Sequence, residues 1–452
     1  MKKTTSVVVL AFLFAPVLLV VAHAQTAAHW PQWRGPFFNG MARGDAPTTW
    51  SDTSNIKWKT AIPGRGFSTP AIWGDRIFLT TAIAVGKPPE TNPTTDTNPG
   101  AGAGQRGRGG NNAPQVEHRF DVLCLDRKTG KILWQQTAKV ATPHEGYHRT
   151  YGSFASNSPV TDGKYVYASF GSRGIYAYDF NGKLIWEKDP NVQMKMRLSF
   201  GEGVAPLLVG DRLFLVFDHE AEQGSFIVAL DKRNGMDLWR AARDERSSWS
   251  TPLAIEHNGR TEIVVSATNK VRSYDPATGK VLWESGGLGA NAIPVPVHQN
   301  GIVYLMSGYR DPKLMAIKLG RDGDLTGSDA IVWSHTRGLS YTASPVLHDN
   351  KLYVVTDNGV ISAFNATTGE PYYSQTRLPK SYMLKSSPVG ANGKLYLAME
   401  DGDVVVLKMG EKFEVIATNH LTDQIFIATP VIAAGELYLR GQNTLFCISE
   451  KK

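Results

Sequence analysis

The stretch Asp126–Trp134, D-R-K-T-G-K-I-L-W, decides the fold because its order returns along the chain. Asp275–Trp283 reads D-P-A-T-G-K-V-L-W, with the glycine turn and the tryptophan in the same places. An aromatic residue follows a turn on the outermost segment of six successive units, at Trp134, Trp186, Trp239, Trp283, Trp333 and Tyr373. We interpret these aromatic residues as packing anchors between repeated structural units.

Eight prolines set the period of the repeat. Each of these prolines begins an apolar segment, and the residues around it are similar from one unit to the next. The eight are Pro70, Pro159, Pro206, Pro252, Pro296, Pro345, Pro388 and Pro430. From Pro159 to Pro430 the intervals average about 45 residues, the period of a four-stranded propeller blade. Short apolar runs separated by Gly, Asn or Asp turns fit strands buried on both faces. The sequence therefore predicts an all-β, eight-bladed β-propeller of four-stranded antiparallel blades.

The N-terminal strand is expected to close the ring. The eighth unit, residues 425–448, stops after its third strand, and Asn55–Lys59 has the pattern of the missing outer strand. Pairing the two would complete the last blade and remove a sheet edge that an open array would expose. We therefore predict one propeller domain over residues 55–452, preceded by a lead-in segment over residues 25–54.

The first 24 residues have the order of a secretory signal peptide. Lys2 and Lys3 precede an apolar run over residues 7–21, and Ala22-His23-Ala24 offers a small-residue cleavage site. The run is too short for a convincing membrane anchor, and no cysteine near the cleavage site supports lipid attachment. We expect a protein exported to the periplasm or secreted after cleavage near Ala24, without a stable membrane anchor.

Composition narrows the class of protein further. Glycine accounts for 44 of 452 residues, and hydrophobic residues make up 42%, which favours a packed β-rich core over a disordered chain. Removing residues 1–24 leaves 46 basic against 41 acidic residues, a net charge of +5 with no basic tract. Such a balance does not favour a nucleic-acid partner. A single propeller of this kind is expected to be monomeric.

Two further features concern the first blade. Residues 85–118, rich in Pro, Gly and Asn, form an insertion that we expect to be a disordered loop. Cys124 and Cys447 are too few for a disulfide framework, and they fall at the same strand position in blades one and eight. Neighbouring third strands lie too far apart for a disulfide, so we predict two buried free thiols.

The units at Asp126–Trp134 and Asp275–Trp283 resemble the pyrroloquinoline-quinone (PQQ) repeat. This is the tryptophan-docking blade of quinoprotein dehydrogenases and of BamB, an outer-membrane assembly lipoprotein. The resemblance covers about residues 55–448, and Trp30–Pro36, W-P-Q-W-R-G-P, is similar to the start of many exported PQQ-repeat proteins. Because the motif residues are structural, the resemblance specifies the fold much better than the function.

Two functions are implied by the resemblance. The first is a binding or scaffold protein that recognises a protein partner in the cell envelope, similar to BamB. The alternative is a PQQ-dependent alcohol or sugar dehydrogenase, with Ca²⁺ held by Glu and Asn, a catalytic Asp and commonly a disulfide of adjacent cysteines. Here the two cysteines are 323 residues apart, and no motif matches the Ca²⁺ ligands or the catalytic Asp. No catalytic residue is assigned, and binding is favoured by elimination.

The candidate binding face consists of the long connections between blades, because functional residues concentrate in variable loops on a rigid scaffold. Its candidate residues are His144, His148, Arg149, Arg173, Asp218, Arg246, Trp249, Asn291, Arg310 and Asp311. His144-Glu145-Gly146-Tyr147-His148 also matches the letters H-E-x-x-H, which would make a metal-dependent hydrolase a remote alternative. Pro143 and Gly146 argue against the helix which that motif requires.

Overall fold

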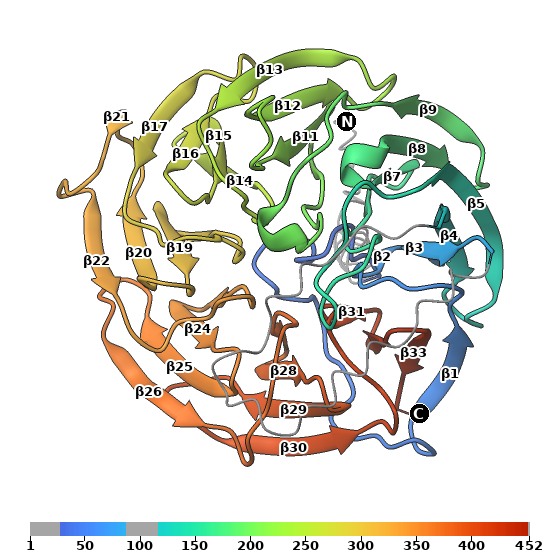
Figure 1. Cartoon of the computed structure of the whole chain (residues 1–452). Helices are drawn as coiled ribbons and strands as arrows, with labels where there is room; N and C mark the ends of the chain where they lie inside the picture. The colour runs from blue at the N-terminus through green and yellow to red at the C-terminus, as the bar shows by residue number, and fades with distance from the viewer. Residues whose placement is uncertain (1–27, 87–115, 451–452) are drawn as a thin grey trace, which may run out of the picture.

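The computed structural model describes residues 28–86 and 116–450. The predicted signal peptide and most of the predicted insertion lie outside these residues. The described part is all-β, with eight sheets arranged around a ring, as Figure 1 shows along the ring axis. The predicted all-β, eight-bladed propeller is thus confirmed. Within the described ranges, no helix has the length and apolarity needed to cross a membrane.

Blades one to four are antiparallel four-stranded sheets, and the fourth carries an additional short strand. From the inner to the outer edge, blade one consists of β2 (Ala71–Trp73), β3 (Arg76–Ala84), β4 (His118–Asp126) and β5 (Ile132–Ala141), and blade two of β6 (Val160–Thr161), β7 (Tyr165–Ser169), β8 (Ile175–Asp179) and β9 (Leu184–Lys188). Blade three consists of β10 (Leu207–Val209), β11 (Arg212–Phe217), β12 (Ser225–Asp231) and β13 (Asp237–Arg243). Blade four consists of β14 (Leu253–His257), β15 (Arg260–Val265), β16 (Val271–Tyr274) and β17 (Val281–Ser285), to which β21 (Gly323–Asp324) is added in parallel.

Blades five to eight repeat the same order. Blade five consists of β18 (Val297–Gln299), β19 (Ile302–Ser307), β20 (Lys313–Lys318) and β22 (Ile331–His335), and blade six of β23 (Val346–His348), β24 (Lys351–Val355), β25 (Val360–Asn365) and β26 (Pro371–Arg377). Blade seven consists of β27 (Val389–Ala391), β28 (Lys394–Ala398), β29 (Asp403–Lys408) and β30 (Val415–His420). Blade eight consists of β31 (Val431–Ala433), β32 (Glu436–Arg440), β33 (Thr444–Ile448) and β1 (Ile56–Ala61). Short 3₁₀ turns, η1 (Gly171–Arg173) and η2 (Arg197–Ser199), lie in loops.

The last blade is built from both ends of the chain. β1 pairs antiparallel with β33, with Trp58 opposite Cys447, and forms the outer strand of that sheet. Figure 1 shows the blue β1 strand beside the red β33 strand. This pairing leaves the ring with no gap between its first and last blades, and so without the edge of an open array.

Tryptophans on the outer strands join neighbouring blades. The indole N–H of five of them donates to a backbone carbonyl of the next blade at 2.8–3.0 Å, for the pairs Trp58–Arg127, Trp134–Phe180, Trp186–Lys232, Trp239–Pro276 and Trp333–Ala366. Each ring also covers a turn glycine of that blade, which leaves no room for a Cβ. Trp283 differs, because its N–H donates to buried Glu262 within its own blade. The prediction of inter-blade anchors is confirmed for Trp134, Trp186, Trp239 and Trp333, and Trp58 docks in the same way.

The residues that precede the inner strands form a second connection around the ring, which we call the axial hydroxyl ring: Thr69, Ser158, Thr251, Ser344, Ser387 and Thr429. Each hydroxyl oxygen accepts the N–H of the matching residue in the preceding blade at 2.9–3.3 Å, including the step from blade eight to blade one. Two junctions lack this bond because the acceptor positions hold Ala205 and Val295, which carry no hydroxyl.

Residues 30–42 fill one end of the central channel, and we call them the N-terminal plug. Trp30 is fully buried and exchanges two 2.8 Å backbone hydrogen bonds with Ile72 of β2. The guanidinium of Arg34 donates to the carbonyl oxygens of Pro345 at 2.6 Å and Pro388 at 3.1 Å. The plug is therefore bonded to blades on different sides of the ring and closes the channel from one side.

Candidate functional site

The other end of the channel is a cavity of about 400 Å³, which we call the axial pocket. It is lined mainly by the long connections that follow the outer strands of the blades. Its aromatic lining residues are Trp33, Phe67, Tyr151, Phe200, Trp249, Tyr309 and Tyr341, and its polar lining includes His148, Arg197, Glu202, Asn291 and Lys385. Binding sites in proteins have this composition, with apolar and aromatic walls and a few placed polar groups.

The floor of the axial pocket comes from the N-terminal plug. Trp33 lines the pocket, and the guanidinium carbon of Arg34 lies 5.5 Å from the centre of its ring. Burial lowers the pKa of Arg34 to about 9, so the side chain remains a cation at neutral pH. Hydroxyls of the axial hydroxyl ring, among them Thr69 and Thr429, complete the floor. The channel is thus a closed cup and not a through-going pore.

The walls of the axial pocket are held by hydrogen bonds between connections. The indole N–H of Trp249 donates to the carbonyl of Gly201 at 2.7 Å. Tyr309 and Tyr341 stack with their ring centres 5.1 Å apart, and the side-chain amide of Asn291 donates to the Tyr341 hydroxyl at 3.2 Å. Aromatic side chains fixed in this way lose little entropy on binding a ligand, which favours tight recognition.

The ionised groups of the lining differ in how far they are neutralised. Lys385 donates to Asp357 at 2.6 Å and lies 4.7 Å from the centre of the Tyr151 ring. Glu202 accepts the N–H of Ser172 and the guanidinium of Arg173, which balance its charge. The half-exposed Arg197 has no carboxylate in ion-pair contact among the described residues. Arg197 is therefore a cation with which a negatively charged group of a ligand can pair.

Nine of the ten candidate residues from the sequence fall into three groups, and Asp218 lies apart from them in a buried ion pair. His148, Trp249 and Asn291 line the axial pocket. The side chain of Arg173 is buried between Phe120 and Phe154, and His144 lies behind the pocket wall with its Nε2 2.7 Å from the carbonyl of Met194. The exposed remainder, away from the pocket lining, is Arg149, Arg246, Arg310 and Asp311, of which Arg246 lines a shallower polar hollow of about 380 Å³.

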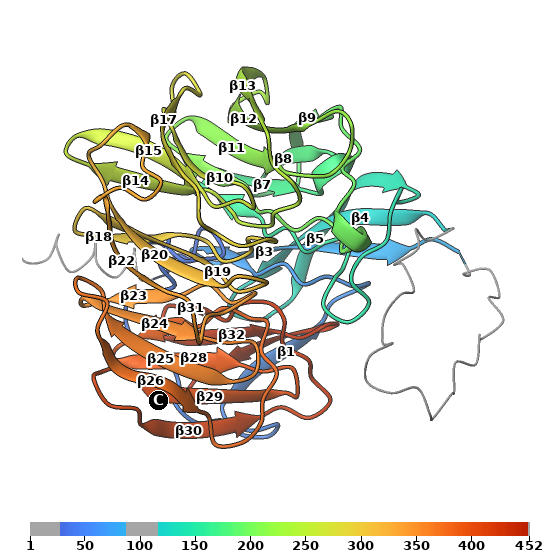
Figure 2. The same cartoon turned by 60° about the vertical axis from the view of Figure 1, so that its left-hand side comes forward.

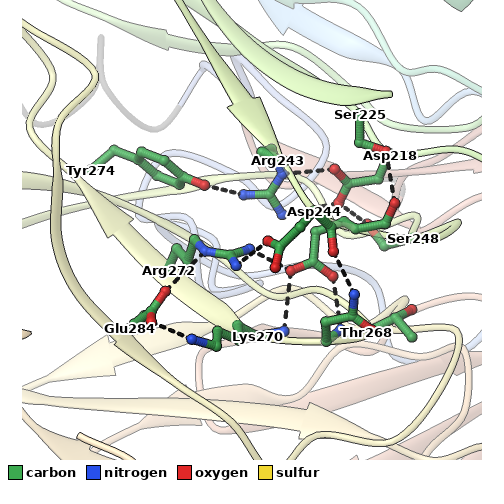
Figure 3. Close-up of polar contacts among 12 residues, drawn as sticks. Asp218, Ser225, Arg243, Asp244, Ser248, Thr268, Lys270, Arg272, Tyr274 and Glu284 are labelled. Atoms are coloured by element: carbon green, nitrogen blue, oxygen red, sulfur yellow. Dashed lines mark hydrogen bonds and ion pairs between the residues drawn. The ribbon is translucent and has the colours of Figure 1, made fainter. Parts of the chain in front are cut away.

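Asp218 lies in a buried polar network and not on the surface. Its carboxylate receives two hydrogen bonds from Arg243, at 2.7 and 3.0 Å, and one from the Ser248 hydroxyl at 2.6 Å (Figure 3). Neither side chain of the ion pair is exposed to solvent. Arg272, in β16, bonds to Glu245 in the connection after β13. This network fixes the connection that carries Trp249, so Asp218 positions the pocket wall and does not face a ligand.

In the structure, the two histidines of the H-E-x-x-H segment, His144 and His148, have different neighbours. Nδ1 of His148 accepts the N–H of Tyr151 at 3.2 Å, and the two rings stack 4.5 Å apart. The donor atoms that come together are those of His144, Glu145 and Glu202, within 4.8 Å of one another. The segment is a loop because its glycine and proline do not support a helix. A peptidase-like site of His144, Glu145 and His148 is therefore wrong for the described structure.

Sequence reasoning missed several pocket residues. Trp33 was noted only as part of a resemblance, and Arg197, Phe200 and Lys385 carry no motif. The spacing of the repeat could have found Arg197, Phe200 and Lys385, because each lies between an outer strand and the next inner strand, whereas Trp33 precedes the first blade. The conformation of each loop turns these side chains toward the ring axis, and loop conformation leaves no repeating pattern in the sequence.

A family model described as "Outer membrane protein assembly factor BamB" matches residues 118–309 and 321–412. The chain belongs to this family. BamB of Yersinia pestis is 21% identical over 345 residues, which cover 71% of this chain and 78% of that protein. Among solved structures, BamB from Moraxella catarrhalis superposes with a TM-score of 0.54 at 15% identity, covering 72% of this chain and 91% of that one.

A europium-containing methanol dehydrogenase superposes with a TM-score of 0.63 at 11% identity, covering 93% of this chain and 90% of the other. At such identities the solved structures support the fold alone. The predicted PQQ-like repeat propeller is thus confirmed.

The residues of the axial pocket do not fit PQQ with Ca²⁺ as the resemblance implies. Cys124 and Cys447 are both free and buried within blade sheets, away from the pocket lining, so they cannot form a disulfide against a quinone there. Among the described lining residues Glu202 is the one carboxylate and Asn291 the one side-chain amide, with no Asp beside them, whereas Ca²⁺ takes about six to eight oxygen ligands. No step of a quinone-dependent reaction is therefore derived for this chain.

Proposed function

We propose that the protein is an exported binding propeller that holds a segment of a cell-envelope protein in the axial pocket. The observation that carries the proposal is the cup itself, closed at its floor by Trp33 and open on the loop-rich face. Tryptophan, tyrosine and arginine dominate the energetics of protein interfaces, and the lining supplies all three. The lining favours a segment that presents an apolar or aromatic side chain beside a carboxylate.

Membership of the family supports this proposal. The matching family model and the Yersinia pestis relative are named as outer membrane protein assembly factors, which supports a role among envelope proteins, although a tetrathionate hydrolase of Acidithiobacillus ferrooxidans matches a similar share of the chain. The signal-like N-terminus is in keeping with export to the same compartment. Identity of about a fifth leaves the particular partner undetermined by comparison, so the pocket chemistry must identify it.

The experiment uses two matched substitutions of a cation. Arg197→Gln changes the axial pocket, and Lys183→Gln changes an exposed turn on the opposite face of the ring. A partner would first be identified by photo-crosslinking from the position of Trp249, then purified for binding measurements. We expect Arg197→Gln to weaken binding about tenfold, which is 1.4 kcal/mol, and Lys183→Gln to leave it unchanged. Thermal melting of each variant verifies that it is folded.

Two results would count against the proposal. One is loss of binding in Lys183→Gln with full binding in Arg197→Gln, which would move the interface to the tight-turn face. The other is tight binding of PQQ with Ca²⁺, seen by visible absorbance, together with turnover of an alcohol or sugar in a dye-linked assay. That second result would establish the dehydrogenase alternative in spite of the donor set described above.

A further inference from the structure

Two connections on the loop-rich face are held side by side behind the axial pocket. One follows β5 and carries His144, and the other follows β9 and contains η2. The Oε2 atom of Glu145 accepts the N–H of Met196 at 3.1 Å, and the N–H of His148 donates to the carbonyl of Phe200 at 3.1 Å. The second connection supplies Arg197, Phe200 and Glu202 to the pocket wall. Whatever joins these connections therefore also fixes part of the pocket.

Three donor side chains meet where the two connections touch. One ligand atom each of His144, Glu145 and Glu202 lies within 4.8 Å of the others, and the Nε2 of His144 is 4.0 Å from Oε1 of Glu202. Glu145 is only 7% exposed, and its Oε1 has no hydrogen-bond partner among the described residues. A buried carboxylate oxygen with no donor is costly, and its position in a group of further donor atoms points to a missing cation.

The charges around the group leave one carboxylate uncompensated. Arg173 bonds to Glu202 at 3.1 Å and so balances that residue, whereas Glu145 has no ion pair with any residue of the ranges 28–86 and 116–450. A bound cation would supply the opposite charge that Glu145 lacks. Exposed His144 gives an ion a route to the group from solvent.

We propose that His144, Glu145 and Glu202 form a binding site for a divalent transition-metal cation of the Zn²⁺ type, which clamps the two connections together. One imidazole and two carboxylates are donors that suit such ions better than Ca²⁺ or Mg²⁺. On binding, the Nε2 atom of His144 exchanges its hydrogen bond with the Met194 carbonyl for the metal. Glu202 also lines the axial pocket, so the proposed metal site lies in the pocket wall, and its metal binding can be measured without the proposed partner.

The test measures Zn²⁺ binding to the untagged, EDTA-treated mature protein by competition with a chromophoric chelator. The chain offers a matched pair, since His144→Gln removes a proposed ligand and His148→Gln removes the other histidine of the same loop. Glu145→Gln keeps an oxygen that can accept the Met196 N–H, so the fold should persist. We expect one Zn²⁺ per chain at micromolar affinity or better, and a loss of at least about tenfold in His144→Gln and Glu145→Gln.

A second readout follows the clamp itself. Zn²⁺ should raise the melting temperature of the wild-type protein and of His148→Gln, but not of the two ligand variants, because only a folded site binds the ion. Absence of a one-to-one complex in the wild-type protein overturns the proposal. So does equal Zn²⁺ affinity in wild type and Glu145→Gln, or a loss in His148→Gln as large as that in His144→Gln.

Discussion

The backbone N–H of Thr429 donates a 3.1 Å hydrogen bond to Oγ1 of Thr69, 360 residues earlier in the chain. This bond joins the last blade to the first at the ring axis, where both residues are buried. β1 and β33 join the same two ends of the chain at the circumference. The ring is therefore closed twice, once near its axis and once at its rim.

Replacing Thr69 by valine should loosen the axial closure. Valine has nearly the shape of threonine but leaves the N–H of Thr429 without an acceptor, which costs about 1–3 kcal/mol for a buried donor. Thr69→Ser keeps a hydroxyl and should recover most of the free energy of unfolding. Denaturant unfolding followed by intrinsic fluorescence measures both. Equal stability of the valine variant and wild type would show that this bond contributes nothing.

Two glycines separate the effect of tryptophan docking from that of backbone strain. Gly130 has φ +74°, and a Cβ there would lie 2.5 Å from the Trp58 ring, whereas Gly393 has φ +72° and open space. Gly393→Ala should cost about 1–2 kcal/mol for the left-handed conformation alone. Gly130→Ala should cost about 2 kcal/mol more, because Trp58 must move. The measurement is the difference in unfolding free energy, and similar values for both variants would contradict the docking interpretation.

Removing the charge of Arg34 should release the N-terminal plug. In Arg34→Met the carbonyls of Pro345 and Pro388 lose their donors, and we expect a loss of about 2–4 kcal/mol. Chymotrypsin should then cut near Trp33 and Phe37 at low concentration, with the products identified by mass spectrometry. The control is Arg43→Met, where the side chain stacks on Phe37 and makes no such pair of bonds. Protection of the plug in Arg34→Met would show that Arg34 does not hold it.

Both cysteines should be unreactive until the protein unfolds. Burial raises the pKa of Cys124 and of Cys447 to about 12, so almost no thiolate exists at pH 8, and neither sulfur is exposed. A thiol reagent should count about none in the native protein and two after denaturation without reductant. A count of zero in the denatured protein, with a mass two protons lighter, would establish a disulfide instead.

The repeat allowed the propeller to be predicted in detail. Proline positions and glycine turns identified the blades, and the docking role of tryptophans such as Trp134 followed from their place on outer strands. These features recur along the sequence because every blade packs against its neighbours in the same way. Trp283 departed from the pattern because Glu262, a buried acid on β15, offers its indole N–H a partner within the same blade. Nothing in the repeat indicated that this acid would be buried.

The axial pocket could be predicted only in part. His148, Trp249 and Asn291 were found because they lie in long connections, but the same criterion selected Asp218 and Arg173, which are buried in ion pairs. Loop position does not reveal which charged side chain has a partner. The floor was unpredictable for a different reason, since Arg34 bonds to proline carbonyls more than 300 residues away and such contacts leave no pattern in sequence.

Pairing of β1 with β33 has a consequence for the order of events during synthesis. Ribosomes make Ile56–Ala61 hundreds of residues before its partner strand Thr444–Ile448. Throughout that interval the first strand cannot adopt its final pairing, and contacts between such distant segments form slowly. A polypeptide that stops short of residue 444 leaves β1 without a partner. The native ring can thus close only after Thr444–Ile448 has been made.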